Sequence, residues 1–285
     1  TLPTHDAISP KIPPWMPDWS RLLAAAPRYP LPGHESRAGV VTFVADTHLG
    51  DARAPAEDFV RLLEQIEARG DTRLLVLMGD LFKAWLALPK YWDAQVRTVM
   101  QALAALRAKG VPVWLVVGNR DYLLPPDGAA ALRAGLPFDQ VIHSGAVLEW
   151  SGRRYGLTHG DLANRQDVQY LKWRRLSRGV LVTGLFRALP GPLARALARK
   201  LEASLADTNQ AIKIHYPAEE LDAFTRAVTP GLDAVFIGHF HQHRLLLPVG
   251  AAAPLHILPD WFSSRQVARL SAEGGLTWLR LTDAP

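Results

Sequence analysis

Five apolar runs of strand length in this sequence each end in a side chain that can bind a metal ion. The first covers residues 40–44 and is followed by Asp46 and His48. Its β-branched and apolar residues are typical of a strand buried on both faces. Residues two positions apart in an extended chain point to the same side, so this carboxylate and this imidazole emerge together. Taken alone, the pattern also fits a helix cap after a strand, and the later runs decide between the two.

The four later runs end in side chains of the same kind. They cover residues 74–78, 111–117, 155–158 and 233–237. The side chains that follow them are Asp80, Asn119, His159, and the pair His239 and His241. Ligands of α/β proteins bind where the carboxyl ends of strands converge. Two carboxylates, one amide oxygen and four imidazoles can hold two metal ions if one carboxylate is shared, and a set without sulfur suits manganese, iron or zinc.

The order of elements predicts a mixed α/β sandwich. Helical patterns over residues 55–69 and 89–109 separate the first three strands, which favours parallel pairing with right-handed crossovers. The last strands, between residues 245 and 281, are expected to form a meander. We expect mixed sheets flanked by helices, with a core of residues 39–164 and 230–285. Residues 1–38 are predicted to be an irregular N-terminal arm, in which residues 19–26 can form a short helix, and residues 165–229 a helical lid insertion.

Charge and composition narrow the class of partner. The net charge of +5 and the pI near 9.6 favour an anionic partner. Residues 165–213 hold ten basic and three acidic side chains, which by themselves also fit a solvated helical face. Leucines rather than stacking aromatics accompany these bases, so nucleic-acid binding is not expected. The absence of cysteine excludes disulfides and thiolate chemistry, and with no secretory signal visible at the start it fits a cytoplasmic protein.

The ordered motifs resemble those of the calcineurin-like metallophosphoesterases. They are Asp46-x-His48, Gly79-Asp80, Gly118-Asn119-x-Asp121, His159 and Gly238-His239-x-His241. The resemblance covers residues 40 to about 245 and implies two divalent metal ions. One ion would be held by Asp46, His48, Asp80 and His241, and the other by Asp80, Asn119, His159 and His239. Asp121 is expected either to orient a ligand or to serve only as a turn residue.

Arg120 distinguishes this chain within that family. Two metal ions lower the pKa of a bound water from about 15.7 towards 7 and stabilise phosphoryl charge. Many family members carry a histidine after the third-motif asparagine, where it can protonate the leaving group, and this chain has Arg120. Arginine is too basic for that role, but its fork binds phosphate oxygens. The resemblance implies catalytic roles for Asn119, Arg120 and His239, and a leaving group such as a phosphate ester anion released from a pyrophosphate.

The segments around residues 79–85 and 118–124 resemble the UDP-2,3-diacylglucosamine diphosphatases of lipid A biosynthesis. That group is Mn²⁺-dependent, is peripheral on the cytoplasmic face of the inner membrane, and attacks the α-phosphate of its glycolipid substrate to release UMP and 2,3-diacylglucosamine 1-phosphate. The alternative is a metallophosphoesterase for another phospholipid or nucleotide. A metal-free binding module is not favoured, because no predicted ligand is missing. Oligomeric state is not predicted.

The resemblance also implies substrate contacts. They are Arg120, Asp167, Tyr170, Ser204 and Lys213. Leucines recur near helical spacing between residues 181 and 201, and they fit either ordinary helix packing or a groove for acyl chains. Two departures from the group bear on the substrate: Lys83 replaces a usual glutamate, and Phe240 replaces a usual threonine.

Overall fold

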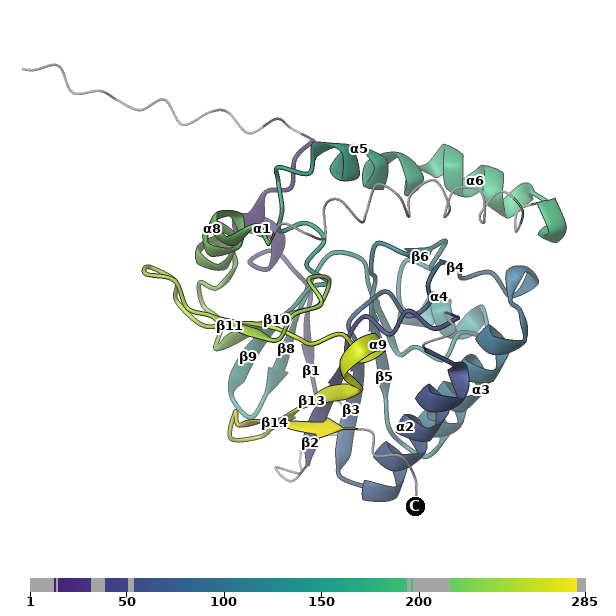
Figure 1. The fold of residues 1–285 in the computed structure, drawn as a ribbon, viewed down its shortest axis with the longest axis horizontal. Helices are drawn as coiled ribbons and strands as arrows, with labels where there is room; N and C mark the ends of the chain where they lie inside the picture. Colours follow the sequence, from purple (N-terminus) through teal and green to yellow (C-terminus); the bar gives the residue numbers. More distant parts are fainter. Residues whose placement is uncertain are drawn as a thin grey trace, which may run out of the picture.

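Two six-stranded sheets form the centre of the molecule, as a computed structural model shows (Figure 1). The structure describes residues 13, 15–31, 39–50, 54–193, 196 and 216–280. The inner faces of the sheets enclose one apolar cluster, in which Phe43 stacks on Phe236 at a ring distance of 4.7 Å. Helices cover the outer faces. The prediction of a mixed α/β sandwich is therefore confirmed.

The first sheet has the strand order β14-β13-β2-β3-β5-β7. Its strands are β2 (Val40–Val44), β3 (Thr72–Leu77), β5 (Val113–Val116), β7 (Gln140–Ile142), β13 (Gln266–Ser271) and β14 (Leu276–Arg280). The four from β2 to β7 are parallel, and β13 and β14 are added antiparallel. Two short strands, β4 (Trp85–Leu86) and β6 (Asp121–Tyr122), pair with each other outside this sheet. Parallel pairing after each helical crossover agrees with the prediction.

Helices α2 (Ala56–Arg69), α3 (Ala94–Ala108) and α4 (Gly128–Arg133) lie on the outer side of the first sheet (Figure 1). Helix α2 buries Phe59, Leu62, Leu63 and Ile66 on one face. The predicted helix over 89–109 was wrong at its start. Pro89–Tyr91 is the 3₁₀ turn η1, and α3 begins only after Asp93, whose carboxylate accepts the Val96 N–H at 2.9 Å.

The second sheet has the order β1-β8-β9-β10-β12-β11. Its strands are β1 (Arg28–Pro30), β8 (Ala146–Trp150), β9 (Arg153–Leu157), β10 (Ala234–Ile237), β11 (Arg244–Leu246) and β12 (Leu255–Ile257). Helices α1 (Trp19–Leu22) and α8 (Ala218–Val228) cover its outer face, with Trp19 edge-on to Phe224 at 5.5 Å. The short helix expected in the arm is present as α1, where Trp19 is buried, whereas strand β1 was not expected and pairs with β8.

The predicted C-terminal meander was also wrong. Strand β12 lies between β10 and β11, in parallel with β10, because Leu255 and Ile257 are buried with the α8 residues. Helix α9 (Trp261–Ser264) then leads the chain to the other sheet, where β13 and β14 pair. The four strands predicted to form one meander therefore belong to different sheets, β11 and β12 to the second and β13 and β14 to the first.

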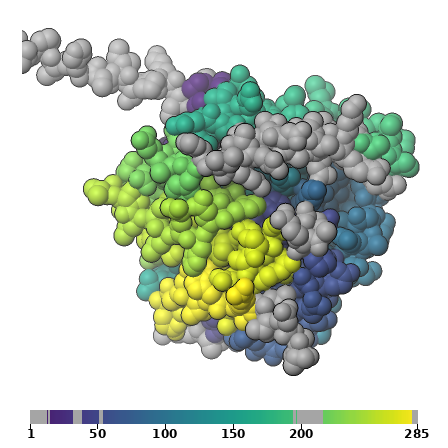
Figure 2. Space-filling model, viewed as in Figure 1, coloured from purple at the N-terminus to yellow at the C-terminus, as the bar shows by residue number. Residues whose placement is uncertain are grey.

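Two helices of the lid insertion, α5 (Val168–Ser177) and α6 (Val180–Ala188), lie in a row along one edge of the molecule (Figures 1 and 2). Phe186 of α6 packs with Tyr91 of η1, and Tyr91 Oη donates to the carbonyl oxygens of Phe186 and Leu189. Helix α8, which we expected within the insertion, packs on the second sheet instead. Within the described ranges, no helix combines the length and hydrophobicity that crossing a bilayer requires.

Candidate metal centre

The seven predicted ligands lie together, on loops that follow five strands. Asp46 and His48 follow β2, Asp80 follows β3, Asn119 follows β5, His159 follows β9, and His239 and His241 follow β10. Strand pairing brings these loops to one end of the two sheets. Because each loop leaves a rigid strand, its ligand is placed by the sheet rather than by the loop alone.

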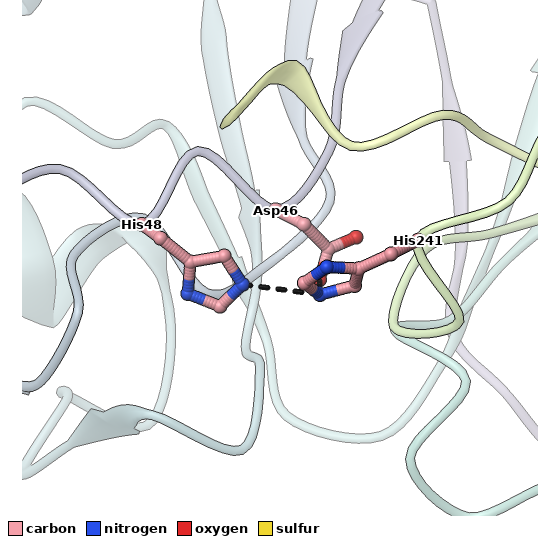
Figure 3. Close-up of side chains that lie close together, drawn as sticks. All are labelled: Asp46, His48 and His241. Atoms are coloured by element: carbon pink, nitrogen blue, oxygen red, sulfur yellow. Dashed lines mark hydrogen bonds and ion pairs between the residues drawn. The ribbon is translucent and has the colours of Figure 1, made fainter. Parts of the chain in front are cut away.

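Asp46, His48 and His241 form one group of ligand atoms (Figure 3). His48 Nε2 lies 3.1 Å from His241 Nε2, and His241 Nε2 lies 3.5 Å from Asp46 Oδ1. The ligand atoms of the group are all within 4.8 Å of one another. Three such atoms pointing at one space can coordinate a single cation.

A second group adjoins the first. It combines Asp46, Asp80 and His159 within the same 4.8 Å limit. Asn119 Oδ1 lies 3.1 Å from His159 Nε2 and 3.0 Å from His239 Nδ1, so the amide oxygen and two imidazoles also converge. The arrangement therefore offers two adjacent sets of ligands.

Asp80 lies between the two sets. Its Oδ2 is 4.0 Å from His48 Nε2, and its Oδ1 is 3.7 Å from His159 Nε2. Its side chain is nearly inaccessible to solvent, at 3% exposure. The bridging role expected for Asp80 stays a prediction, which these distances allow.

The residues present fit divalent metal ions. Asp46 Oδ1 is buried and receives no hydrogen bond from the described residues. Such a buried oxygen needs a partner, and a bound cation would supply it. Burial lowers the pKa of His48 and of His239 to about 4, which keeps both imidazoles neutral near pH 7. Metal binding requires neutral imidazoles and ionised carboxylates. Oxygen and nitrogen donors without sulfur match ions such as Mn²⁺, Fe²⁺ or Zn²⁺.

The ligand loops have unusual backbone conformations. Five of the predicted ligands have positive φ, namely Asp46 at 49°, His48 at 45°, Asp80 at 52°, His239 at 69° and His241 at 51°. Side chains other than glycine rarely adopt this left-handed region, and such residues gather at functional sites. The geometry of the ligands is therefore held in a strained backbone, which no pattern in the sequence indicated.

Glycines next to the predicted ligands allow close approach of the backbone to the carboxylates. A Cβ at Gly118 would lie 2.3 Å from Asp80 N and Oδ1, and one at Gly238 would lie 2.5 Å from Asp46 Oδ2. Both distances are too short for a carbon atom. Only glycine lets these loops contact the carboxylates.

Asp121 connects two ligand loops. Its carboxylate accepts the Asp80 N–H at 2.9 Å, the Leu81 N–H at 3.2 Å and the Gly118 N–H at 2.8 Å. Burial, together with the charge of Asp80, raises the pKa of Asp121 to about 6. These bonds favour the interpretation that Asp121 orients a ligand over that of a simple turn residue.

A cavity of about 240 Å³ opens beside the ligands. Arg120, Asp167 and Tyr170 line it together with His48, Asp80, Asn119, His239 and His241. The Arg120 Nε lies 3.6 Å from Asp80 Oδ2, and Nη1 donates to Lys83 O at 3.1 Å. Three of the predicted substrate contacts thus border the ligand cluster, whereas Ser204 and Lys213 lie outside the described residues.

Asp167 and Tyr170 also have structural partners. The Asp167 carboxylate caps α5 by accepting the Tyr170 N–H at 2.9 Å, and Tyr170 Oη donates to Asp161 Oδ2. Phe240, at a position of departure from the resembled group, packs edge-on against His239 at 5.1 Å. Lys83 is exposed, and its contact with Arg120 is made by its backbone carbonyl rather than by its side chain.

Sequence reasoning missed a group of residues on α5 and near it. Arg174 Nε donates to the buried Asp161 Oδ2 at 2.6 Å, and Arg178 Nη2 donates to Gly118 O at 2.7 Å. Tyr216, Asn164 and Gln242 also line the cavity. The acidic residue of the His159-Gly160-Asp161 triplet was the available signal that a basic partner should be sought.

Comparison with known proteins gives consistent matches. The family model for calcineurin-like phosphoesterases matches residues 39–243. A UDP-2,3-diacylglucosamine hydrolase from Stenotrophomonas maltophilia is 31% identical over 246 residues, 81% of this chain and 95% of that protein. The protein of the same name from Ralstonia nicotianae is 32% identical over 79% of this chain and 84% of its own length. A solved dimetal phosphatase from Danio rerio aligns over 86% of this chain and 99% of its own, at 12% identity and a TM-score of 0.42.

Proposed function

This chain belongs to the calcineurin-like phosphoesterase family, and we propose that its substrate is UDP-2,3-diacylglucosamine. The reaction would hydrolyse the pyrophosphate at the α-phosphate and release UMP and 2,3-diacylglucosamine 1-phosphate. The observation that carries the proposal is the cluster of seven ligands beside Arg120, at the edge of a cavity bordered by the lid insertion. Curated relatives named for hydrolysis of this substrate, 30–32% identical over about four fifths of the chain, support it.

We infer that two divalent ions, most consistent with Mn²⁺, are the cofactors. Asp46, His48, Asp80 and His241 would hold one ion, and Asp80, Asn119, His159 and His239 the other. When bound, such a pair activates water at neutral pH and neutralises the charge that develops on the phosphoryl group.

Arg120 is proposed to bind the phosphoryl oxygens. Its guanidinium borders the cavity and is restrained by Asp80 and by the Lys83 carbonyl, so it is already oriented towards the ligand cluster. Arginine remains protonated and donates hydrogen bonds without transferring a proton. A leaving group that departs as a phosphate ester anion needs no general acid, which agrees with a pyrophosphate substrate.

Asn119 and His239 are proposed to complete the site next to the reacting phosphate. The Asn119 amide oxygen faces His239 Nδ1 at 3.0 Å, and the His239 backbone N–H donates to Asp46 Oδ2 at 2.8 Å. These bonds orient His239. Both residues border the cavity, so substrate and ligands would share one enclosed space.

We propose that the α5–α6 segment docks on an anionic membrane surface as a peripheral contact. Val180 and Leu181 are 86% and 89% exposed, and they line a groove of about 500 Å³ with Lys172 and Arg175. Apolar side chains next to bases are typical of interfacial helices that bind acidic lipids. Leu181→Glu should reduce sedimentation with phosphatidylglycerol vesicles, and unchanged sedimentation would contradict the docking surface.

The test of the proposed function is identification of the products. Purified protein with added Mn²⁺ should convert UDP-2,3-diacylglucosamine to UMP and the lipid 1-phosphate, as mass spectrometry would show. Phe240 and Lys83 depart from the usual residues of the resembled group, which favours one alternative, a metallophosphoesterase for another phospholipid or nucleotide. No turnover of UDP-2,3-diacylglucosamine beside activity on a generic phosphodiester would support that alternative.

A further inference from the structure

Helix α5 of the lid insertion contacts the backbone that carries a predicted metal ligand. Arg178, which follows the last residue of α5, donates from Nη2 to the Gly118 carbonyl oxygen at 2.7 Å. The two residues are 60 positions apart in the sequence. We propose that Arg178 is a positioning residue, which fixes the amide oxygen of Asn119 for metal binding and so makes the docking of α5 part of the metal centre. This inference rests on the proposed function.

Gly118 is held by hydrogen bonds at its N–H and at its carbonyl. The Gly118 N–H donates to Asp121 Oδ2 at 2.8 Å. The carbonyl accepts from Arg178 Nη2 at 2.7 Å and, at the longer distance of 3.4 Å, from the backbone N–H of Asp121. The carbonyl shares one rigid plane with the nitrogen of Asn119, so holding the oxygen fixes the rotation of that plane. The Asn119 side chain projects from the next atom along the chain. Arg178, as the shorter of the two contacts to this carbonyl, therefore helps to set the direction in which the amide oxygen points.

The position of the amide oxygen matters because its neighbours are close. Asn119 Oδ1 lies 3.1 Å from His159 Nε2 and 3.0 Å from His239 Nδ1. Rotation of the peptide plane would move this oxygen out of the set while leaving both histidines in place. A guanidinium donor makes a stronger hydrogen bond than a neutral group, which suits a part-buried carbonyl.

Helix α5 depends on such polar contacts for its place. Only Leu171 and Ser177 of its residues are buried. Arg174 adds a second contact, its ion pair with the buried Asp161, two residues after His159. Polar contacts of this kind outside the ligand set typically change metal affinity or activity by about 10–100-fold when removed.

The test compares Arg178→Met with Arg178→Lys and Arg178→Gln in the full chain after removal of metal. Arg187→Met is the matched control, because Arg187 is an exposed arginine of the neighbouring helix α6. Electron paramagnetic resonance of free Mn²⁺ measures binding directly, and steady-state kinetics gives kcat and KM. Arg178→Met should weaken one of two Mn²⁺ sites by about 10–100-fold and leave the other unchanged. Arg178→Lys, which keeps a cationic donor, should restore part of the affinity, and the control should bind like the wild type.

The outcomes separate this inference from the proposed function. Wild-type binding of two ions by Arg178→Met, with kcat unchanged, would overturn the positioning role and leave the proposed function intact. Equal loss at both sites would also overturn it, because it would indicate a general structural defect. If Arg178→Met does not fold, Arg178→Gln is judged by the same criteria. Failure of the wild-type protein to bind Mn²⁺ would overturn the proposed function and this inference together.

Discussion

Asp80→Asn should abolish most of the stabilisation that metal ions give this protein. Asp80 faces both sets of ligands, with oxygens 4.0 Å from His48 Nε2 and 3.7 Å from His159 Nε2. An amide has one oxygen and no charge, so it cannot serve two cations. At a Mn²⁺ concentration 100 times the Kd, binding at one site stabilises the folded state by about 2.7 kcal/mol. For a chain of this size that corresponds to a rise in Tm of roughly 4–5 °C.

The metal-free variant should unfold close to the wild-type temperature. The amide oxygen can still accept the Arg120 N–H, which the wild-type carboxylate accepts at 2.8 Å. Removal of the charge also relieves repulsion from Asp121, whose pKa is raised to about 6 by burial and by Asp80. Asp127→Asn is the control, because Asp127 only caps α4 and asparagine caps equally well. Differential scanning calorimetry with and without Mn²⁺ gives the shift, and a full wild-type shift in Asp80→Asn would refute the reasoning.

Three further changes test other parts of the structure. Gly118→Ala places a Cβ 2.3 Å from Asp80 N and Oδ1. Calorimetry should therefore show that the free energy of unfolding falls by about 1–3 kcal/mol, and titration should show weaker Mn²⁺ binding. Burial, and to a lesser extent the charge of His243, lowers the pKa of His256 from 6.5 to about 4. Below pH 6.5 the unfolded chain therefore binds more protons than the native state does. The stability present above pH 6.5 is lost as the pH falls towards 4. His256→Phe should therefore flatten the fall in Tm between pH 7 and 4.5, and an unchanged slope would contradict this. Tyr91→Phe removes the hydrogen bond that the hydroxyl shares between the Phe186 and Leu189 carbonyl oxygens, worth about 1 kcal/mol, and should speed proteolysis within α6.

The convergence of the seven candidate ligands could be predicted, because each of them follows a local pattern. A buried strand has its own apolar pattern, and the spacing of Asp46 and His48 determines their common direction. The chain order of the later runs then supplied the rest of the set. Positive φ at these positions could not be predicted, since it results from how the loops from both sheets fit against one another.

Contacts between residues far apart in the sequence could not be predicted from local sequence patterns. Arg175 in α5 and Arg178 just after it look alike in the sequence, yet of these two only Arg178 donates to the Gly118 carbonyl. Strand β1 was missed because three residues carry little pattern, and its pairing with β8 is made far along the chain. The start of α3 was misjudged because Pro89 is typical of a first helical turn, while the carboxylate cap was supplied later by Asp93.

The left-handed backbone at five predicted ligand positions means that the proposed activity of this protein comes at a cost in thermal stability. Glycine adopts positive φ without the steric penalty that aspartate or histidine incurs there. A glycine at His241, for example, would relax the backbone of the metal-free chain and remove a ligand at the same time. Selection of variants by heat resistance alone would therefore enrich inactive proteins, as in other stability–function trade-offs. Stabilised and active versions should instead be sought on the outer helices, away from these loops.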